Sequence, residues 1–256
     1  MESLLQFEHV LSCTIVERVN RFVVAVDMDG ERQRAWINNT GRLEAFMQPG
    51  TAAYCLPKQG GKTDVRLFAV ADGDAAALVD TRFQMDAFER AVHRQLLPWL
   101  HDCSMVQRDA PLGDSRIDYL LSCAGEPCYL EVKSAVLRSG RTALYPDCPS
   151  TRGRRHVAEL VDHARRGGTS ALLFAAGLPG VSSFRPNRMA DERLARLIVA
   201  AADAGVAVHA VGLCYLPEGR AVVLFDDDVP VLPPVGHYSQ GVRRGKGGEQ
   251  GQGGKQ

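Results

Sequence analysis

The amino-acid sequence predicts a mixed α and β protein in two parts, a small β-barrel followed by a larger α/β domain. Three observations lead to this prediction. Short strand-like runs alternate with turns up to about residue 72, helical periodicity first appears beyond residue 80, and helices then alternate with strands. The length of 256 residues suits one large or two small domains, which we place at residues 1–76 and 77–238. Residues 239–256, rich in glycine and glutamine, are predicted to form a disordered tail.

Five short runs in the first part have the composition of β-strands and are bounded by turn residues. They cover residues 13–16, 22–28, 33–37, 52–56 and 65–70. Five strands of this length suit a small barrel. A short helix is expected within the barrel, at residues 41–47.

The second part begins with a helix at residues 85–97, which presents Phe88, Ala91 and Val92 on one face and is followed by Pro98. Its further elements are strands at residues 115–121, 129–133 and 141–145, a helix at 151–166, a strand at 170–176, a helix at 188–204 and strands at 206–213 and 221–225. The predicted order therefore starts as helix, three strands, helix and strand.

Two of these strands are mostly apolar but also carry charged residues, which packing alone does not explain. Asp118 lies in the first strand, and Glu131 and Lys133 share one face of the second because side chains alternate across a strand. A turn at residues 123–127 joins the strands as a hairpin, which brings the three side chains together. Buried charges need partners or a metal, and paired carboxylates suit a hard divalent cation. The alternative is a cross-strand ion pair without a metal.

The spacing of these residues, Asp-x12-Glu-x-Lys, resembles the signature of PD-(D/E)xK nucleases. Further landmarks occur in the order found in the sugar fermentation stimulation protein A family. They are RFVVAV at residues 21–26, NTGR at 39–42, PG at 49–50, SRID at 115–118, EVKS at 131–134, YPD at 145–147 and RGRRH at 152–156. The chain resembles this family over nearly the whole of residues 21–231.

The resemblance implies an N-terminal OB-like β-barrel followed by a PD-(D/E)xK, restriction-endonuclease-like α/β domain. It also implies a nuclease that hydrolyses phosphodiester bonds in DNA and/or RNA with Mg²⁺ or Mn²⁺. Asp118 and Glu131 are then the metal ligands, and Lys133 orients the attacking water. Asp109 stands where the family has a glutamate and is a candidate auxiliary acid, although a surface acid before a turn is an equal alternative. Glu89 on the preceding helix is a weaker candidate.

Three basic residues are assigned to the substrate by the same resemblance. Arg116 belongs to the SRID landmark, and Arg152 and His156 lie four residues apart near the start of a helix, where anions are attracted. The alternative for Arg152 and His156 is a solvated helix face. The competing function is a non-cleaving nucleic-acid-binding regulatory protein linked to sugar metabolism, and a structural cluster of ion pairs is a third reading.

Composition limits these functions only weakly. The formal net charge is zero, but residues 138–166 contain seven arginines against three acidic residues, a local excess of four positive charges. Seven cysteines without a repeated close-pair spacing, and no apolar leader or membrane-length run, lead us to expect reduced thiols in a cytoplasmic protein with no membrane association. The sequence does not predict the oligomeric state.

Overall fold

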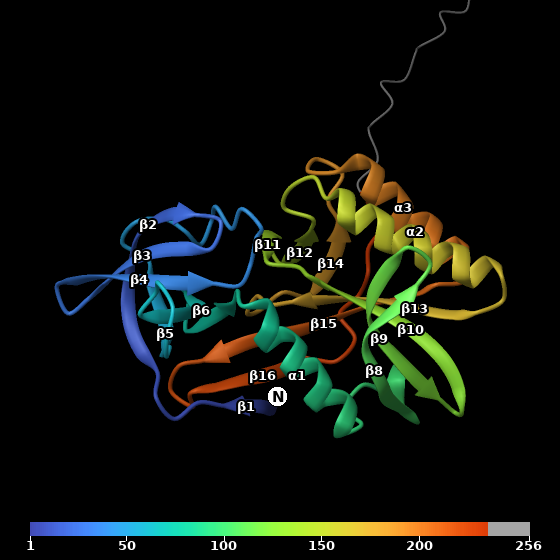
Figure 1. Ribbon diagram of the computed structural model, residues 1–256, viewed down its shortest axis with the longest axis horizontal. Helices are drawn as coiled ribbons and strands as arrows, with labels where there is room; N and C mark the ends of the chain where they lie inside the picture. The colour runs from blue at the N-terminus through green and yellow to red at the C-terminus, as the bar shows by residue number, and fades with distance from the viewer. Residues whose placement is uncertain (235–256) are drawn as a thin grey trace, which may run out of the picture.

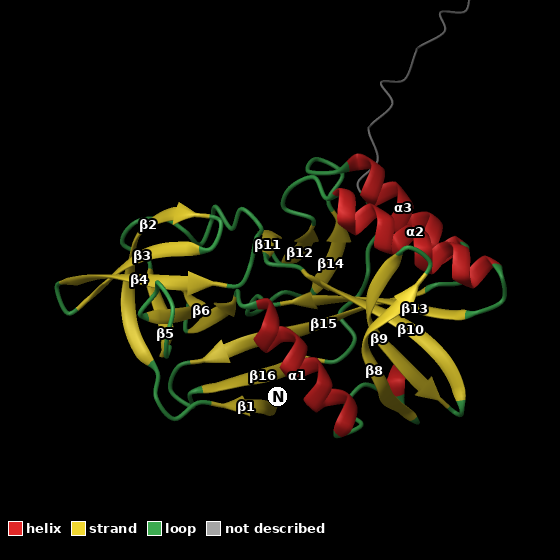
Figure 2. Cartoon of the chain, viewed as in Figure 1, coloured by secondary structure: helices red, strands yellow, loops and turns green. Residues whose placement is uncertain are grey.

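The computed structural model describes residues 1–234, so the tail predicted at residues 239–256 lies outside the described residues. Among residues 1–234 the chain forms a 13-stranded sheet, a separate 3-stranded sheet and three α-helices (Figure 1). Figure 2 shows that strands dominate both parts of the molecule. The barrel lies at one end, and two helices lie side by side at the other.

The barrel is closed by five strands, all of which the sequence predicted. They are β2 (Leu11–Asn20), β3 (Val23–Met28), β4 (Glu31–Ile37), β5 (Ala52–Pro57) and β6 (Val65–Asp72). The strands follow the order β4-β3-β2-β5-β6, and a parallel pairing of β4 with β6 closes the ring. The helix predicted at residues 41–47 is wrong, because Leu43 has a left-handed backbone (φ 52°) and the segment forms a turn in which Phe46 N–H donates to the Leu43 carbonyl.

The two parts of the chain share one sheet and one core. Strand β6 pairs with β7 (Ala75–Leu78), which pairs with β15 (Ala207–Leu216) of the second part. The first strand, β1 (Glu2–Gln6), pairs with the last one, β16 (Ala221–Asp226). One buried cluster contains barrel residues such as Leu67 together with helix residues such as Leu160. The barrel is therefore packed into the rest of the molecule.

The second part has five strands between its first two α-helices where the sequence predicted three, and three of the five belong to the main sheet. Its main elements are α1 (Thr81–His93), the 3₁₀ turn η1 (Pro98–Leu100), β8 (Cys103–Leu112), β9 (Ser115–Cys123), β10 (Glu126–Ser134), α2 (Thr151–Arg165), β13 (Thr169–Ala176) and α3 (Glu192–Asp203). Strands β8, β9 and β10 are antiparallel, and β13 continues the sheet parallel to β10.

Strand β8 was missed because its central residues are exposed and polar, so it has no apolar run. The predicted strand at residues 141–145 is formed as β12 (Thr142–Tyr145), but it lies outside the main sheet. It pairs with β11 (Leu137–Ser139) and β14 (Ser183–Pro186) in the separate small sheet.

The helices pack against the strands and against each other. Asp80 begins α1, its carboxylate accepting from the Arg82 N–H at 2.9 Å, and α1 packs against β1, β8 and β16. Helices α2 and α3 pack against each other, and α2 also contacts β9, β10 and β13. Asp191 caps α3, which therefore starts later than predicted. None of the described helices is long and apolar enough to cross a bilayer.

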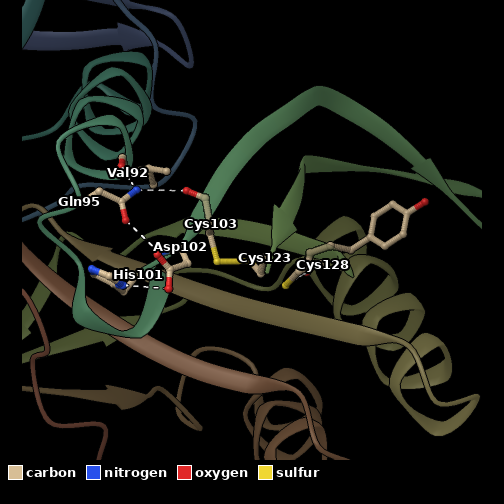
Figure 3. The surroundings of a disulfide bond; sticks show 8 residues. Val92, Gln95, His101, Asp102, Cys103, Cys123 and Cys128 are labelled. Carbon is tan, nitrogen blue, oxygen red and sulfur yellow. Dashed lines mark hydrogen bonds and ion pairs between the residues drawn. A yellow bond between two sulfur atoms is a disulfide. The ribbon is translucent and has the colours of Figure 1, made fainter. Parts of the chain in front are cut away.

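The cysteines depart from the sequence expectation of reduced thiols. Cys103 and Cys123 are direct partners in the register of β8 and β9, and they form a disulfide with a Cα–Cα distance of 4.0 Å (Figure 3). Their sequence separation of 20 residues is produced by the hairpin and matches no short spacing motif. The other cysteines are free, and Cys128 lies close to the bridge in β10.

Candidate metal and phosphate site

Asp118 and Glu131 occupy the point at which β9 and β10 separate. The regular pairing of the two strands ends at Tyr119 and Leu130. Beyond it, the Val132 N–H donates to Asp118 Oδ2 at 2.8 Å, and the Asp118 N–H donates to Glu131 Oε2 at 3.1 Å. Each carboxylate therefore accepts from the opposite strand in place of a backbone carbonyl. This arrangement places two acidic groups between the strands and satisfies the backbone N–H groups there.

Glu131 also contacts a lysine and a histidine. Its Oε1 atom accepts from Lys133 Nζ and lies 2.5 Å from His156 Nδ1. Glu131 is 1% exposed and His156 is 2% exposed, so the contact is shielded from water. Leu130, on the opposite face, belongs to the core beneath α1. The shared face predicted for Glu131 and Lys133 is the one found in the structure.

The two carboxylates have different proton affinities. Burial, followed by repulsion from Glu131, raises the pKa of Asp118 from 3.8 to about 6. Burial also acts to raise the pKa of Glu131, but the attraction of Lys133 and the hydrogen bond from His156 outweigh it and lower this pKa. The Lys133 ammonium loses solvation, yet the neighbouring Glu131 carboxylate raises its pKa and keeps it charged. Two neighbouring acids whose pKa values are shifted in opposite directions are typical of functional sites.

His156 is held in one tautomer by Arg152. The Arg152 Nε–H donates to His156 Nε2 at 3.2 Å, so Nε2 is an acceptor and the ring proton lies on Nδ1, from which it is donated to Glu131. Both residues belong to the first two turns of α2, which Ser150 caps by accepting from the Gly153 N–H at 3.0 Å. The sequence predicted that His156 contacts the substrate. In the structure its buried ring contacts Glu131, one of the two predicted metal ligands.

Asp191 positions this end of α2, a role that the sequence did not reveal. Its carboxylate accepts from the Ser150 N–H at 3.0 Å and from Arg154 Nη1 at 2.7 Å, while capping α3 through the Leu194 N–H. These groups are about 40 residues apart in sequence, so only the packing of α2 against α3 brings them together.

The donor set fits a hard divalent cation that keeps part of its hydration shell. A carboxylate has about four lone-pair positions, and Asp118 uses one for the Val132 N–H while its Oδ1 atom accepts no hydrogen bond from the described residues. No group of three His, Cys, Asp or Glu side chains in residues 1–234 has metal-binding geometry. Mg²⁺ is commonly held by one or two carboxylates together with waters and substrate phosphate oxygens, so a pair of acids does not need a third protein ligand.

The other predicted acids lie away from this pair. Asp109 is exposed in a left-handed conformation (φ 50°), and its backbone carbonyl accepts from Arg116 Nη1 at 3.0 Å. No hydrogen bond or ion pair among the described residues joins the Asp109 carboxylate to Asp118 or Glu131. Glu89, on α1, accepts from the Tyr119 hydroxyl at 2.8 Å and pairs with Arg108, so both of its carboxylate oxygens already have partners.

A loop of the barrel also reaches the site. Asn39 is buried and donates to the Val79 carbonyl at 3.0 Å and towards Ser134 Oγ at 3.4 Å, at the end of β10. The Asp147 carboxylate fills the space where a side chain on Gly41 would lie. Between these segments is a pocket of about 300 Å³ that Lys133 lines. The NTGR, EVKS and YPD landmarks therefore meet in space, a convergence that sequence order alone does not show.

The comparisons with known proteins cover both parts of the chain. Residues 16–79 match the SfsA N-terminal OB domain, and residues 82–219 match the sugar fermentation stimulation protein RE domain. A sugar fermentation stimulation protein homolog from Pyrococcus furiosus is 45% identical over 210 residues, covering 82% of this chain and 91% of that protein. The homolog from Archaeoglobus fulgidus is 47% identical over 195 residues, covering 76% and 85%.

A solved structure agrees at the level of the whole fold. The structure of Pyrococcus furiosus SfsA in complex with Ca²⁺ superposes with a TM-score of 0.87 at 40% sequence identity, covering 91% of this chain and all of that one. Fold and site together define a protein with an N-terminal OB barrel and a mostly β C-terminal domain that carries a buried carboxylate and lysine cluster. The chain belongs to the sugar fermentation stimulation protein family.

Proposed function

We propose that the chain is a metal-dependent nuclease with a PD-(D/E)xK-type catalytic domain, which hydrolyses phosphodiester bonds in DNA and/or RNA. The observation that carries this proposal is the junction of β9 and β10, where Asp118, Glu131 and Lys133 meet in one buried cluster. A protein that only bound nucleic acid would gain nothing from two acids beside a phosphate, because they repel it. Paired acids are useful there when a cation lies between them and the phosphate.

Each residue has a distinct part in the proposed reaction. Asp118 and Glu131 would hold Mg²⁺ or Mn²⁺, which supplies charge neutralisation at the phosphate and lowers the pKa of water. Lys133 keeps its charge beside Glu131 and stabilises the negative charge that develops as water adds to phosphorus and the P–O bond breaks. His156 fixes Glu131 Oε1 from the side of α2. Arg152, whose Nη groups have no partner among the described residues, would contact substrate phosphate.

The relative from Pyrococcus furiosus supports the metal part of the proposal. That protein was solved in complex with Ca²⁺, and its fold is shared over 91% of this chain. Calcium and magnesium both prefer oxygen ligands, although Ca²⁺ takes more of them. The competing function, a non-cleaving nucleic-acid-binding regulator linked to sugar metabolism, takes its support from the name that the relatives carry.

Calorimetric titration with Mg²⁺ or Mn²⁺ tests the metal requirement of the proposal. Asp118→Asn and Glu131→Gln should each lose binding, whereas Asp114→Asn, which changes an exposed acid outside the cluster, should bind as the wild type does. Equal binding by all four proteins would remove the metal site and with it the nuclease mechanism.

A further inference from the structure

A second pocket lies on the α2 side of the cluster. It has a volume of about 490 Å³ and is formed by the turn between β8 and β9 and by the first turns of α2. Arg116, Arg152 and Arg155 line it, and Asp114 is the one acidic residue among its lining residues. The pocket is therefore strongly positive in a chain whose formal net charge is zero. Such a concentration of guanidinium groups indicates an anionic ligand.

None of the three arginines is neutralised by a carboxylate within residues 1–234. Arg116 donates to a backbone carbonyl, and Arg152 donates through Nε to a histidine ring. The Arg155 side chain has no hydrogen bond or ion pair with the described residues. Its potential partner four residues later, Glu159, instead accepts from the Asp114 N–H at 3.2 Å. Glu159 therefore binds the turn between β8 and β9 and does not pair with Arg155.

The backbone of the turn makes that arrangement possible. Gly113 has a left-handed conformation (φ 55°), and a side chain there would collide with the Glu159 carboxylate. Glycine therefore lets the Glu159 carboxylate dock on the turn, where it forms no ion pair with Arg155.

A buried hydroxyl at the pocket provides an independent indication of a ligand. Ser115 is only 5% exposed, it lines the pocket, and its Oγ has no hydrogen-bond partner among the described residues. An unpaired buried hydroxyl costs free energy, and a phosphate oxygen bound at this end of the pocket would supply the missing partner.

The pocket adjoins the proposed metal centre. His156 lines it and contacts Glu131 Oε1, the same oxygen to which Lys133 donates from the side of the 300 Å³ pocket. Glu131 thus contacts one lining residue of each pocket, an arrangement in which one nucleic-acid strand could reach both. We propose that the pocket of Ser115, Arg116, Arg152 and Arg155 binds a second phosphate group of the nucleic acid, separate from the phosphate that undergoes hydrolysis.

This inference rests on the proposed function for the identity of the ligand, but its test needs no cleavage. The phosphate has two possible sources, a terminal monoester or an internal diester, and both accept hydrogen bonds from guanidinium and hydroxyl groups. Affinity is measured in EDTA by fluorescence anisotropy, with short oligonucleotides that carry a 5′-phosphate, a 3′-phosphate or neither.

Arg155→Ala should weaken binding by roughly tenfold, the effect of losing one charge-assisted hydrogen bond. The matched control is Arg165→Ala, which removes an exposed charge from the last turn of the same helix and should change affinity by less than about twofold. For a terminal source, the loss should be confined to one phosphorylated oligonucleotide, and for an internal source it should be the same for all three. Equal effects of Arg155→Ala and Arg165→Ala would overturn the proposal.

Ser115→Ala separates ligand binding from a structural role. Removing an unpaired buried hydroxyl should leave the melting temperature of the free protein unchanged or higher, while affinity for the oligonucleotide falls. Unchanged affinity in this variant would exclude the pocket. Phosphate binding that persists in a protein without cleavage activity would instead remove the nuclease proposal and retain the pocket.

Discussion

Replacing Asp118 by asparagine should make the metal-free protein more stable while abolishing metal binding. Asparagine has nearly the same shape, and its side-chain oxygen can still accept from the Val132 N–H, which now lies 2.8 Å from Asp118 Oδ2. What the substitution removes is a buried negative charge beside Glu131. A site that holds two acids for a metal should be destabilised by their repulsion when no metal is bound.

The magnitude and its pH dependence follow from the pKa of Asp118. Burial and Glu131 raise this pKa from 3.8 to about 6 in the folded protein, and a rise of roughly two units corresponds to about 3 kcal/mol. The folded state therefore holds the proton more tightly than the unfolded state. Stability is fully present below pH 4 or so and is lost as the pH rises through about 6. Asp118→Asn should escape that loss.

Urea denaturation in EDTA at about pH 4.5 and about pH 8 measures the effect. The variant should be more stable than the wild type by up to about 3 kcal/mol at the higher pH and by only about 1 kcal/mol at the lower pH, which lies just above the pKa of 3.8 of the unfolded chain. Asp114→Asn, the exposed control, should show no such dependence. A variant that is less stable than the wild type at the higher pH would refute the argument that the Asp118 charge is strained.

Three further changes test other parts of the account. Lys133→Ala should slow cleavage by at least about 100-fold while changing nucleic-acid affinity little, because this residue acts on charge that develops in the transition state; folding is checked by circular dichroism. Arg152→Ala should weaken binding and reduce the slope of log affinity against log salt by about one, unlike Arg165→Ala. Cys103→Ser should lower the free energy of unfolding by about 3 kcal/mol, the value for a loop of some 20 residues, and a reductant should destabilise the wild type equally but leave this variant unchanged.

Local patterns in the sequence were sufficient for elements with a clear apolar period. The five barrel strands and α2 were predicted within a few residues, since their buried faces recur at the spacing of a strand or a helix. Strand β8 was not, because it is stabilised by pairing with β9 and not by an apolar run of its own. The helix expected at residues 41–47 failed because a left-handed residue, Leu43, turns the chain.

The site shows the same division between local and distant information. The spacing of Asp118, Glu131 and Lys133 along two strands predicted their meeting, since a hairpin fixes which residues face each other. The contact of His156 with Glu131 spans 25 residues and depends on how α2 crosses the sheet. The support given to α2 by Asp191 depends on α3 in the same way. Such contacts are consequences of tertiary packing, which no local motif encodes.

The most direct test of the central claim is cleavage of end-labelled DNA and RNA, single- and double-stranded, in Mg²⁺ or Mn²⁺. We expect the wild type to cleave at least one of these substrates, EDTA to stop the reaction, and Glu131→Gln to be inactive although folded. Cleavage by Glu131→Gln at the wild-type rate, or a wild type that binds these nucleic acids but cuts none of them with either metal, would contradict the assignment.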